Sequence, residues 1–376
     1  MEIAIIGAGI GGLTTALALK AVNIPFKVYE SAPELKAVGA GIILANNAMQ
    51  VYRHLGVHEG IAQLGNRISV LNITRPDLQV LSSSSLQPFE NRFHLHNLAV
   101  HRADLHHFLS DAIGMENIYT GKKLKQIIRH RNRFTLAFED GTFTDAENVI
   151  GADGIRSVVR QQLFGESNIR DGKQFCWRGV VDFELPQSYH HELNELWGKG
   201  KRFGFVKLNA KQVYWYLLAD TALIQPGIDP FFFLNDFHPL AKQLVQATPR
   251  EKWIAAGLFD LVPLPKWSME GVCLLGDAAH ATTPNLGQGA CQAIEDAYVI
   301  GALLKKNYSI RETFRRYPAI RMEKARYIAD TSWKIGKIAH WRNPLAIALR
   351  NTLLKSTPAS ANNKRLGRIF ELDSIA

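Results

Sequence analysis

The chain has 376 residues, of which 47% are hydrophobic and 21% charged, so it is globular and long enough for two domains. No apolar run approaches the roughly 18 residues that cross a bilayer, and the apolar start is too short for a signal peptide, so no integral membrane segment is expected. Three cysteines without C-x-x-C spacing argue against a metal site and favour a reducing, cytoplasmic location.

The N-terminus predicts a nucleotide-binding strand, turn and helix. A short apolar strand is followed by Gly7, Gly9 and Gly12, which fill a G-x-G-x-x-G pattern, and then by a helix over residues 13–20. In this motif the first glycine permits a tight turn, the second lets the backbone approach a pyrophosphate, and the third allows close helix packing. A second strand ends in Glu30, which is placed to accept hydrogen bonds from a ribose diol. The pattern therefore predicts a dinucleotide site.

Over residues 31–113 the chain is predicted to leave the nucleotide-binding part and then to return to it. A loop over 34–44 and a helix over 47–56 precede residues 67–97, whose alternating pattern and turn signals predict antiparallel strands. A helix over 102–113 then brings the chain back to the nucleotide-binding part.

A second glycine-rich element follows a predicted hairpin over residues 127–143. An apolar strand ends in Gly151-Ala152-Asp153-Gly154 and leads into a basic helix start. An Asp-Gly pair taken alone is more often an ordinary turn than a site. In this sequence, however, the pair occurs together with other glycine-rich motifs.

Residues 174–264 carry strand patterns rich in aromatic side chains, which predict a second antiparallel sheet and a natural substrate domain. Because side chains alternate along a strand, Tyr214 and Tyr216 share one face and Trp215 takes the other. Only one of these two sets can line a pocket.

A third element combines an acid with a glycine-rich turn. The apolar strand 272–275 leads into Gly276-Asp277, and Gly287-Gln288-Gly289 precedes a helix that begins near residue 290. The N-terminus of that helix favours an anionic or electron-rich group. Two readings of Asp277 remain: a ligand to the bound group, or a cap for its own helix. His280 is expected to order this loop rather than to transfer a proton.

The order G-x-G-x-x-G, Asp-Gly and Gly-Asp resembles the single-component (group A) FAD-dependent aromatic hydroxylases, relatives of which include the flavin urate hydroxylases, the salicylate hydroxylases and zeaxanthin epoxidase. The resemblance covers most of the chain and includes segments 39–42, 101–105 and 177–179. It implies an α/β (α+β) fold: a Rossmann-like FAD-binding domain of the glutathione-reductase type, an inserted antiparallel-sheet substrate domain and C-terminal helices.

On this basis we predict three parts of the chain. The FAD-binding domain is discontinuous, the substrate domain is inserted into it, and a helical segment ends the chain. Their boundaries are 1–66, 98–173 and 265–310 for the FAD-binding domain, 67–97 and 174–264 for the substrate domain, and 311–376 for the helices.

The resemblance implies that FAD is held by residues of all three motifs together with Arg102. Arg102 and Asp277 would contact its sugar and phosphate oxygens, Pro284 would face the isoalloxazine ring, and Asp153 would lie beside the transient path of NADH or NADPH. The implied cofactor-binding residues are Gly7, Gly9, Ile10, Gly11, Gly12, Glu30, Gly41, Arg102, Asp153, Asp277, Pro284, Gly287, Gln288 and Gly289.

The implied activity is that of a monooxygenase. It would use NAD(P)H and O2 to hydroxylate an aromatic or heteroaromatic small molecule through a flavin C4a-hydroperoxide. The alternatives are an epoxidase or a drug-inactivating monooxygenase of the same superfamily, and a flavin-dependent reductase or halogenase. The strand around residues 213–217 does not provide the W-x-W-x-I-P segment of the halogenases. No residue is assigned as certainly catalytic.

The substrate-facing candidates are Arg202, Tyr214, Asn285 and Pro284. Arg202 and Tyr214 resemble the arginine and tyrosine that face substrate in the urate hydroxylases. The alternative is an exposed turn arginine and a tyrosine that merely packs the sheet. Asn285 stands where the urate hydroxylases carry an acid, and this loss of charge argues against urate as the substrate.

The formal net charge of +10 is concentrated toward the C-terminus, without a nucleic-acid motif. We therefore expect no nucleic-acid partner, but a small ring-bearing substrate and a monomer or homodimer. The amphipathic, basic helix predicted over residues 343–355 has two interpretations. The preferred one is that its apolar stripe covers the nucleotide-binding domain, and the other is peripheral contact with a membrane.

Overall fold

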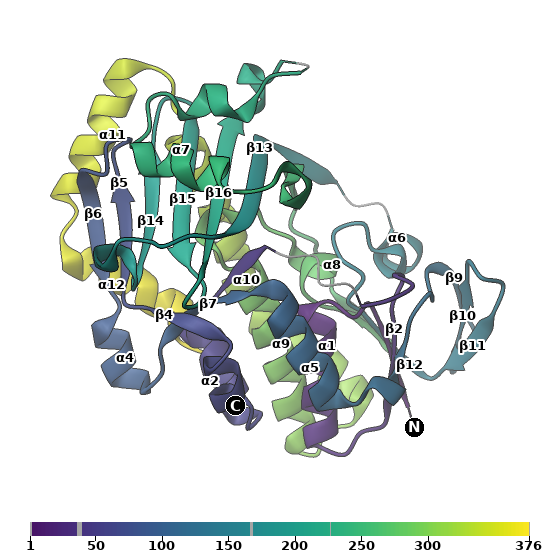
Figure 1. Cartoon of the computed structure of the whole chain (residues 1–376). Helices are drawn as coiled ribbons and strands as arrows, with labels where there is room; N and C mark the ends of the chain where they lie inside the picture. Colours follow the sequence, from purple (N-terminus) through teal and green to yellow (C-terminus); the bar gives the residue numbers. More distant parts are fainter. Residues whose placement is uncertain (1, 36–39, 166–167, 226, 376) are drawn as a thin grey trace.

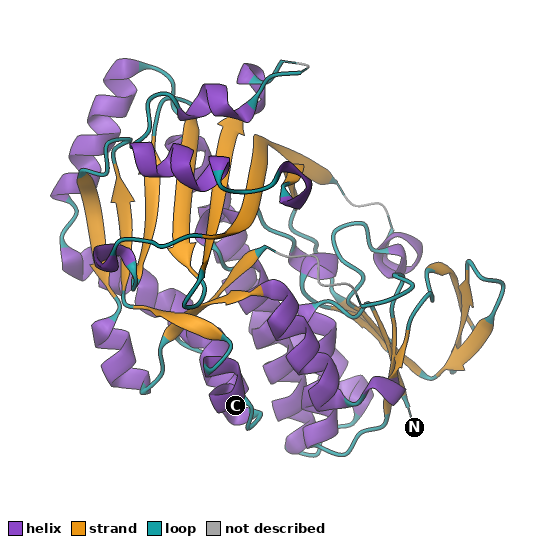
Figure 2. Ribbon diagram, in the orientation of Figure 1, coloured by secondary structure: helices purple, strands orange, loops and turns teal. Residues whose placement is uncertain are grey.

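Two sheets assembled from segments far apart in the sequence organise the fold (Figures 1 and 2). Gly39, which belongs to one of the segments that resemble the hydroxylases, lies outside the described residues. This computed structural model of the chain describes residues 2–35, 40–165, 168–225 and 227–375.

The first sheet has six strands in the order β18-β19-β12-β1-β2-β8. Strands β2, β1, β12 and β19 run parallel to one another. Strands β1, β12 and β19 are buried along their whole length, as expected for apolar strands of a parallel sheet covered on both faces. The strands are β1 (Ile3–Ile6), β2 (Phe26–Tyr29), β8 (Ile118–Tyr119), β12 (Asn148–Gly151), β18 (Ser268–Met269) and β19 (Val272–Leu274).

Three helices pack together beside this sheet: α1 (Ile10–Ala21), α5 (Arg102–Ile113) and α9 (Gly289–Lys305) (Figure 1). The contact between α1 and α9 is close because Gly301 has no side chain. A Cβ atom at Gly301 would lie 3.0 Å from the Cβ of Ala18. The two helices that follow the first and third glycine-rich motifs therefore lie side by side.

Smaller elements surround the two main sheets. The three-stranded sheet β3-β7-β4 contains β3 (Gly41–Leu44), β4 (Gly65–Ile68) and β7 (Asn97–His101), and another contains β9 (Leu124–Arg129), β10 (Phe134–Phe138) and β11 (Phe143–Ala146). The short helices are α2 (Asn46–His54), α3 (His58–Ala62), α4 (Gln87–Phe93), α6 (Val158–Phe164), α7 (Pro239–Gln246) and α8 (Asp277–His280). The 3-10 turns are η1 (Met115–Asn117), η2 (Gln187–Tyr189), η3 (Thr221–Leu223), η4 (Pro230–Leu234), η5 (Arg250–Lys252) and η6 (Pro284–Leu286).

The second main sheet has seven strands in the order β17-β13-β16-β15-β14-β5-β6. One face packs under α7 and η4, where Phe203 and Trp215 belong to a separate apolar core. The other face carries Arg202, Tyr214 and Tyr216. Its strands are β5 (Val70–Thr74), β6 (Val80–Ser85), β13 (Ile169–Asp182), β14 (Glu192–Trp197), β15 (Lys201–Lys207), β16 (Gln212–Asp220) and β17 (Ile254–Leu261).

Two details of this sheet differ from the sequence prediction. Strands β5 and β14 pair in parallel, whereas the other neighbours are antiparallel. The reason is that β5 is joined to β14 by a long crossover rather than a hairpin, so no tight turn dictates its direction. In addition, β13 begins at Ile169, inside the segment predicted for the FAD-binding domain.

The chain ends in helices α10 (Ile310–Ala339), α11 (Pro344–Ser356) and α12 (Ala359–Phe370). Helices α11 and α12 contact β6, the edge strand of the seven-stranded sheet. They therefore protect an edge that would otherwise offer unpaired backbone groups. The preferred interpretation of α11 was wrong: it lies far from the six-stranded sheet, and its apolar stripe is exposed (Figure 1). Periodicity located the stripe but not the surface that it faces.

Candidate active site

The three sequence motifs meet at one edge of the six-stranded sheet. Ile6 pairs with Gly151, and Gly151 pairs with Leu274, so β1, β12 and β19 end together. Backbone hydrogen bonds continue just past the strand ends, from Ala152 N to Ile6 O at 2.8 Å and from Leu275 N to Gly151 O at 3.0 Å. Ligands of open parallel sheets bind outside this carboxyl edge.

The glycines of the first motif have distinct geometric demands. Gly7 has φ +107°, and a Cβ atom there would lie 2.4 Å from Ala152 O. A Cβ atom at Gly12 would lie 2.0 Å from Gly7 O, which only glycine avoids. Gly9 is different, because a Cβ atom there would meet no atom of the described chain within 4 Å. The backbone around Gly9 therefore borders open space that a bound group can enter.

Two helix N-termini point into this region. Helices α1 and α9 both begin without a side-chain cap in the described chain, so their first N–H groups are available to a ligand. A Cβ atom at Gly11 would lie 2.9 Å from the Cβ of Ala293, which places the two helix starts next to each other. Glu30 directly follows β2, and its carboxylate accepts a hydrogen bond from Ala8 N at 2.8 Å.

Gln288 precedes α9, and its side chain is buried away from solvent. Its Oε1 accepts a hydrogen bond from Asn47 Nδ2 at 2.9 Å. The amide side chain therefore braces the loop against α2. Because its side chain is engaged in this way, Gln288 can contact a cofactor only through its backbone.

Arg102 and Asp277 lie close enough for their charges to interact. Both residues keep exposed surface, but the surrounding protein removes enough water from their charged groups to shift both pKa values. Burial lowers the pKa of Arg102, and the charge of Asp277 opposes this effect. Burial raises the pKa of Asp277, and the charges of His280 and Arg102 oppose it. A neighbouring cation and anion beside the ends of β1 and β19 suit a cationic and an anionic contact to one bound molecule.

Asp277 does not cap its own helix. The N-cap position of α8 belongs to Gly276, and no side chain of the described residues caps that helix. The capping alternative is therefore wrong. His280 instead orders the loop, because its Nε2 lies 2.6 Å from Asp296 Oδ2, which also accepts Gly276 N at 2.9 Å.

Asp153 has one structural oxygen and one unpartnered oxygen. Its Oδ2 accepts hydrogen bonds from the backbone N–H groups of Val158 at 2.7 Å and Val159 at 3.2 Å, at the start of α6. Its Oδ1 is buried without a hydrogen-bond partner among the described residues. Burial raises the pKa of Asp153, against the hydrogen bonds that it accepts. The free oxygen can receive a ligand hydroxyl.

We predict that Asp277→Ala weakens FAD binding about 10- to 100-fold, because a hydrogen bond to a charged group contributes about 1.5–3 kcal/mol. Flavin fluorescence titration of the apo protein measures the loss. Asp140→Ala, in an exposed hairpin turn, is the matched control and should bind FAD normally. Unchanged FAD affinity in Asp277→Ala would remove this residue from the site.

The Tyr214 side chain connects the seven-stranded sheet to β3. A Cβ atom at Gly41 would lie 2.4 Å from Tyr214 Cγ, so the ring lies directly on the backbone at Gly41. Burial raises the pKa of Tyr214, and the nearby positive charges of Arg178 and Arg102 oppose this. Trp215, on the opposite face, is buried and donates to Thr248 Oγ1 at 2.8 Å. Of the two sets, the tyrosines are therefore the one on the site side of the sheet.

Arg202 is a buried member of a polar network, not an exposed turn residue. It lies on β15 and is 1% exposed. Its Nη1 donates to Glu195 Oε1 at 2.8 Å, and its Nη2 donates to Asn285 Oδ1. Glu195 Oε2 accepts the Tyr216 hydroxyl at 2.7 Å. Asn285 follows Pro284 in η6, so this network joins the sheet to the third glycine-rich loop.

Glu195 was missed by the sequence reasoning. It also accepts Trp197 Nε1 at 2.6 Å, so all three donors converge on one carboxylate. The available signal was the alternation of Glu195 and Trp197 within a short strand, which places both on one face. Nothing in that pattern pairs Glu195 with Arg202.

His340 lies next to this network and is buried with its Nε2 unpartnered among the described residues. Its Nδ1 lies 2.9 Å from Gly336 O. Burial, followed by the positive charges of Arg202 and Arg350, lowers the pKa of His340 to about 3. The imidazole is therefore neutral in the folded protein.

We predict that His340 makes the fold sensitive to mild acid. Its folded pKa lies below the value of about 6.5 for an unfolded chain, so the unfolded state takes up the proton first as the pH falls. The residue should remove about 2 kcal/mol from the free energy of unfolding between pH 7.5 and 5.0. Urea unfolding at both pH values should show a smaller loss in His340→Gln. The exposed His107→Gln should retain the full loss, and equal losses in both variants would contradict the prediction.

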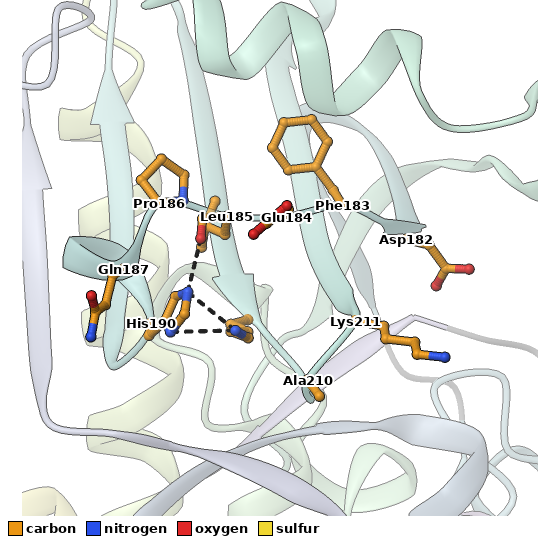
Figure 3. A pocket seen from close by; sticks show the side chains of 10 residues that line it. Asp182, Phe183, Glu184, Leu185, Pro186, Gln187, His190, Ala210 and Lys211 are labelled. Atoms are coloured by element: carbon orange, nitrogen blue, oxygen red, sulfur yellow. Dashed lines mark hydrogen bonds between the residues drawn. The ribbon is translucent and has the colours of Figure 1, made fainter.

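A separate hollow of about 860 Å³ lies at the end of the seven-stranded sheet (Figure 3). His190 Nε2 lies 2.8 Å from Leu185 O, and Lys207 Nζ lies 3.2 Å from the same nitrogen. None of the sequence-predicted site residues lines this hollow, so we do not assign the reaction to it. The lining residues are Asp182, Phe183, Glu184, Leu185, Pro186, Gln187, His190, Lys207, Ala210 and Lys211.

The fold and site define a dinucleotide-binding flavoprotein, and comparisons with known proteins identify its family. The FAD binding domain family matches residues 1–332. Aurachin C monooxygenase/isomerase of Stigmatella aurantiaca is 33% identical, with 100% of this chain and 99% of that protein covered. The 2-heptyl-3-hydroxy-4(1H)-quinolone synthase of Pseudomonas aeruginosa is 31% identical, with 98% of both covered.

A solved structure agrees with these sequence relatives. Klebsiella pneumoniae HpxO, complexed with FAD and uric acid, superposes with a TM-score of 0.90 at 26% identity, over 98% of this chain and 96% of that one. The chain therefore belongs to the FAD-dependent monooxygenase family, and its cofactor is FAD. The predicted family, fold class and cofactor are confirmed.

The residues of the site fit this cofactor. Open space at Gly9, two uncapped helix starts and the neighbouring charges of Arg102 and Asp277 suit a pyrophosphate and its sugars. The individual roles of the cofactor-binding residues stay predictions. Among the described residues, no group of three or more His, Cys, Asp or Glu side chains is arranged to hold a metal ion.

Proposed function

We propose that this FAD-dependent monooxygenase hydroxylates an uncharged heteroaromatic ring that carries an apolar side chain, in the class of the 4-quinolones. The observation that carries the proposal is the state of Arg202, whose charge is already neutralised by Glu195 inside the protein. The names of two relatives support it, since one is a synthase of a heptyl-substituted hydroxyquinolone and the other acts on aurachin C.

Charge distinguishes this substrate class from urate. An anionic substrate requires a cation with spare hydrogen-bond donors, because an unpaired buried charge is costly. Both terminal nitrogens of Arg202 already donate, to Glu195 and to neutral Asn285, and its Nε, although without a partner among the described residues, is buried. An anion placed here would also lie beside the Glu195 carboxylate. A neutral ring avoids both penalties.

The side chains on the site face supply orientation rather than a nucleophile. When bound, FAD supplies the oxygen-activating chemistry, with NAD(P)H as the reductant. The Tyr214 phenol stays protonated because burial raises its pKa, so it can donate to a ring carbonyl. The positive charge of Arg178 lies near that hydroxyl.

The test measures NADH and NADPH oxidation by the FAD-loaded protein with 2-heptyl-4(1H)-quinolone, urate and salicylate, and records product masses. We expect the quinolone to accelerate oxidation and gain one oxygen atom, while the two anions do neither. Acceleration and oxygenation of urate or salicylate, without the quinolone, would overturn the proposal.

Glu195→Gln tests the charge argument directly. This nearly isosteric change leaves Arg202 with an uncompensated charge, so we expect roughly tenfold tighter binding of an anionic phenol relative to a neutral one. Glu184→Gln, in an exposed loop, is the matched control. Identical discrimination in the variant and the control would show that Glu195 does not set the charge of the site.

We also propose that the enzyme works in the cytoplasm as a monomer or homodimer. The cysteines Cys176, Cys273 and Cys291 are all free and buried, which suits a reducing compartment. Light scattering coupled to size-exclusion chromatography measures the oligomeric state. The predicted division into FAD-binding, substrate and C-terminal parts stays part of this proposal.

A further inference from the structure

Helix α11 exposes its leucines to solvent, whereas its buried side carries a charged residue, Arg350. Leu345, Leu349 and Leu353 recur at every fourth residue and form one stripe, with 81%, 57% and 58% of their surfaces exposed. Arg350, in contrast, is buried, donates to Ala339 O at 3.1 Å and lies over the Trp197 ring at 5.3 Å. Helix α11 is thus attached to the rest of the protein through Arg350, while no other part of the described chain covers its three leucines.

The stretch of chain that contains this stripe carries charge of a single sign. Residues 331–370 contain eight Lys and Arg residues and no Asp or Glu. Arg342 precedes α11 and Lys355 lies in its last turn, and both side chains are exposed. The leucine stripe is therefore flanked by cationic groups at both ends.

We propose that the α11 face, defined as Leu345, Leu349 and Leu353 with Arg342 and Lys355, docks on the surface of an anionic lipid bilayer. The leucines would enter the boundary between headgroups and acyl chains, where exposed apolar area is buried, while the basic side chains would contact lipid phosphates. The contact is peripheral, since none of the helices in the described ranges has the length and apolar character that a bilayer crossing requires.

Charge complementarity favours a bilayer over other occupants. A second copy of the chain would bring the same basic face against itself in a two-fold contact, and each copy carries a formal net charge of +10. A nucleic acid would satisfy the basic groups but leave the leucines without an apolar partner. An anionic bilayer satisfies both kinds of group.

The position of α11 determines how the docked protein would be oriented on the bilayer. The helix contacts β6 at the edge of the seven-stranded sheet, away from the six-stranded sheet (Figure 1). Docking would therefore place the substrate sheet next to the bilayer and the FAD-binding sheet farther from it. The inference stands on the surface of α11 and does not require the substrate proposed above.

The experiment is sedimentation of the FAD-loaded full chain with vesicles of phosphatidylcholine, with or without 30% phosphatidylglycerol. We expect binding to the anionic vesicles and little to the neutral ones. The triple variant Leu345→Ser/Leu349→Ser/Leu353→Ser should reduce the bound fraction at least tenfold while keeping its flavin. The matched control Phe143→Ser/Phe232→Ser removes two exposed aromatics from other surfaces and should bind like the parent chain.

A second variant keeps the test independent of helix stability. Arg342→Gln/Lys355→Gln leaves the leucines in place and should weaken binding to anionic vesicles severalfold, with a smaller salt dependence. The proposal is overturned if the parent chain sediments with neither kind of vesicle. It is also overturned if the leucine variant binds normally, or if its only effect is to dissociate a dimer seen by light scattering.

Discussion

Replacing Gly9 with valine is expected to leave the apo protein folded and to reduce FAD affinity at least about 100-fold. A Cβ atom at this position meets no atom of the described chain within 4 Å, and its φ of −67° and ψ of 174° suit a β-branched residue. The new side chain would instead occupy the space over the first N–H groups of α1. Losing two hydrogen bonds to a charged phosphate, at about 1.5–3 kcal/mol each, gives this factor.

The measurement pairs thermal unfolding of the apo protein with a flavin fluorescence titration. Gly12→Ala separates the two effects, because its Cβ atom would lie 2.0 Å from Gly7 O and should destabilise the fold itself. Gly367→Ala, whose Cβ atom meets only the Phe89 side chain at 3.8 Å, should change neither quantity. Normal FAD affinity in Gly9→Val would show that the cofactor does not approach this turn.

Replacing Arg321 with methionine is expected to cost about 3–5 kcal/mol of unfolding free energy. Arg321 is fully buried and donates to Asp296 Oδ1 at 2.9 Å and Glu295 Oε2 at 2.8 Å. Although burial alone would raise the pKa of Asp296, the charges of His280 and Arg321 lower it well below its usual range. The variant would therefore leave ionised carboxylates with insufficient compensation inside the protein.

Urea unfolding of the apo protein measures this loss. Arg315→Met is the control, since Arg315 is exposed and solvent screens its ion pair with Glu312, so its loss should change the unfolding free energy little. FAD affinity should also fall in Arg321→Met, because Asp296 holds Gly276 N and His280 in the third glycine-rich loop. A loss as small as that of the control would show that the cluster is not needed to neutralise these acids.

The local motifs could be predicted because their chemistry is local. Gly7, Gly12 and Glu30 lie within one strand-turn-helix-strand unit, so their spacing already reflects the turn that they form. The convergence of Asp153 and Asp277 on that unit followed from the rule that parallel strands end at a common edge. These inferences use backbone geometry and do not need side-chain packing.

The remainder depends on contacts between distant segments. Glu195 and Asn285 both bind Arg202, but no periodicity links these positions in the sequence. The parallel pairing of β5 with β14 likewise depends on a crossover whose direction no turn motif sets. The outward stripe of α11 could not be predicted because an amphipathic pattern shows that a face exists, not what covers it.

The order of strands β2, β1, β12 and β19 has a consequence for synthesis of the chain. Strand β1 and its neighbour β12 are both made before strands β13 to β17 of the seven-stranded sheet, but β19, which pairs with β12, is made only after them. The inserted sheet can therefore assemble first, and the FAD-binding edge closes only once the residues of α9 emerge. A nascent chain stalled before residue 272 would lack one of the three loops of this edge. The complete FAD-binding edge therefore requires synthesis past this point.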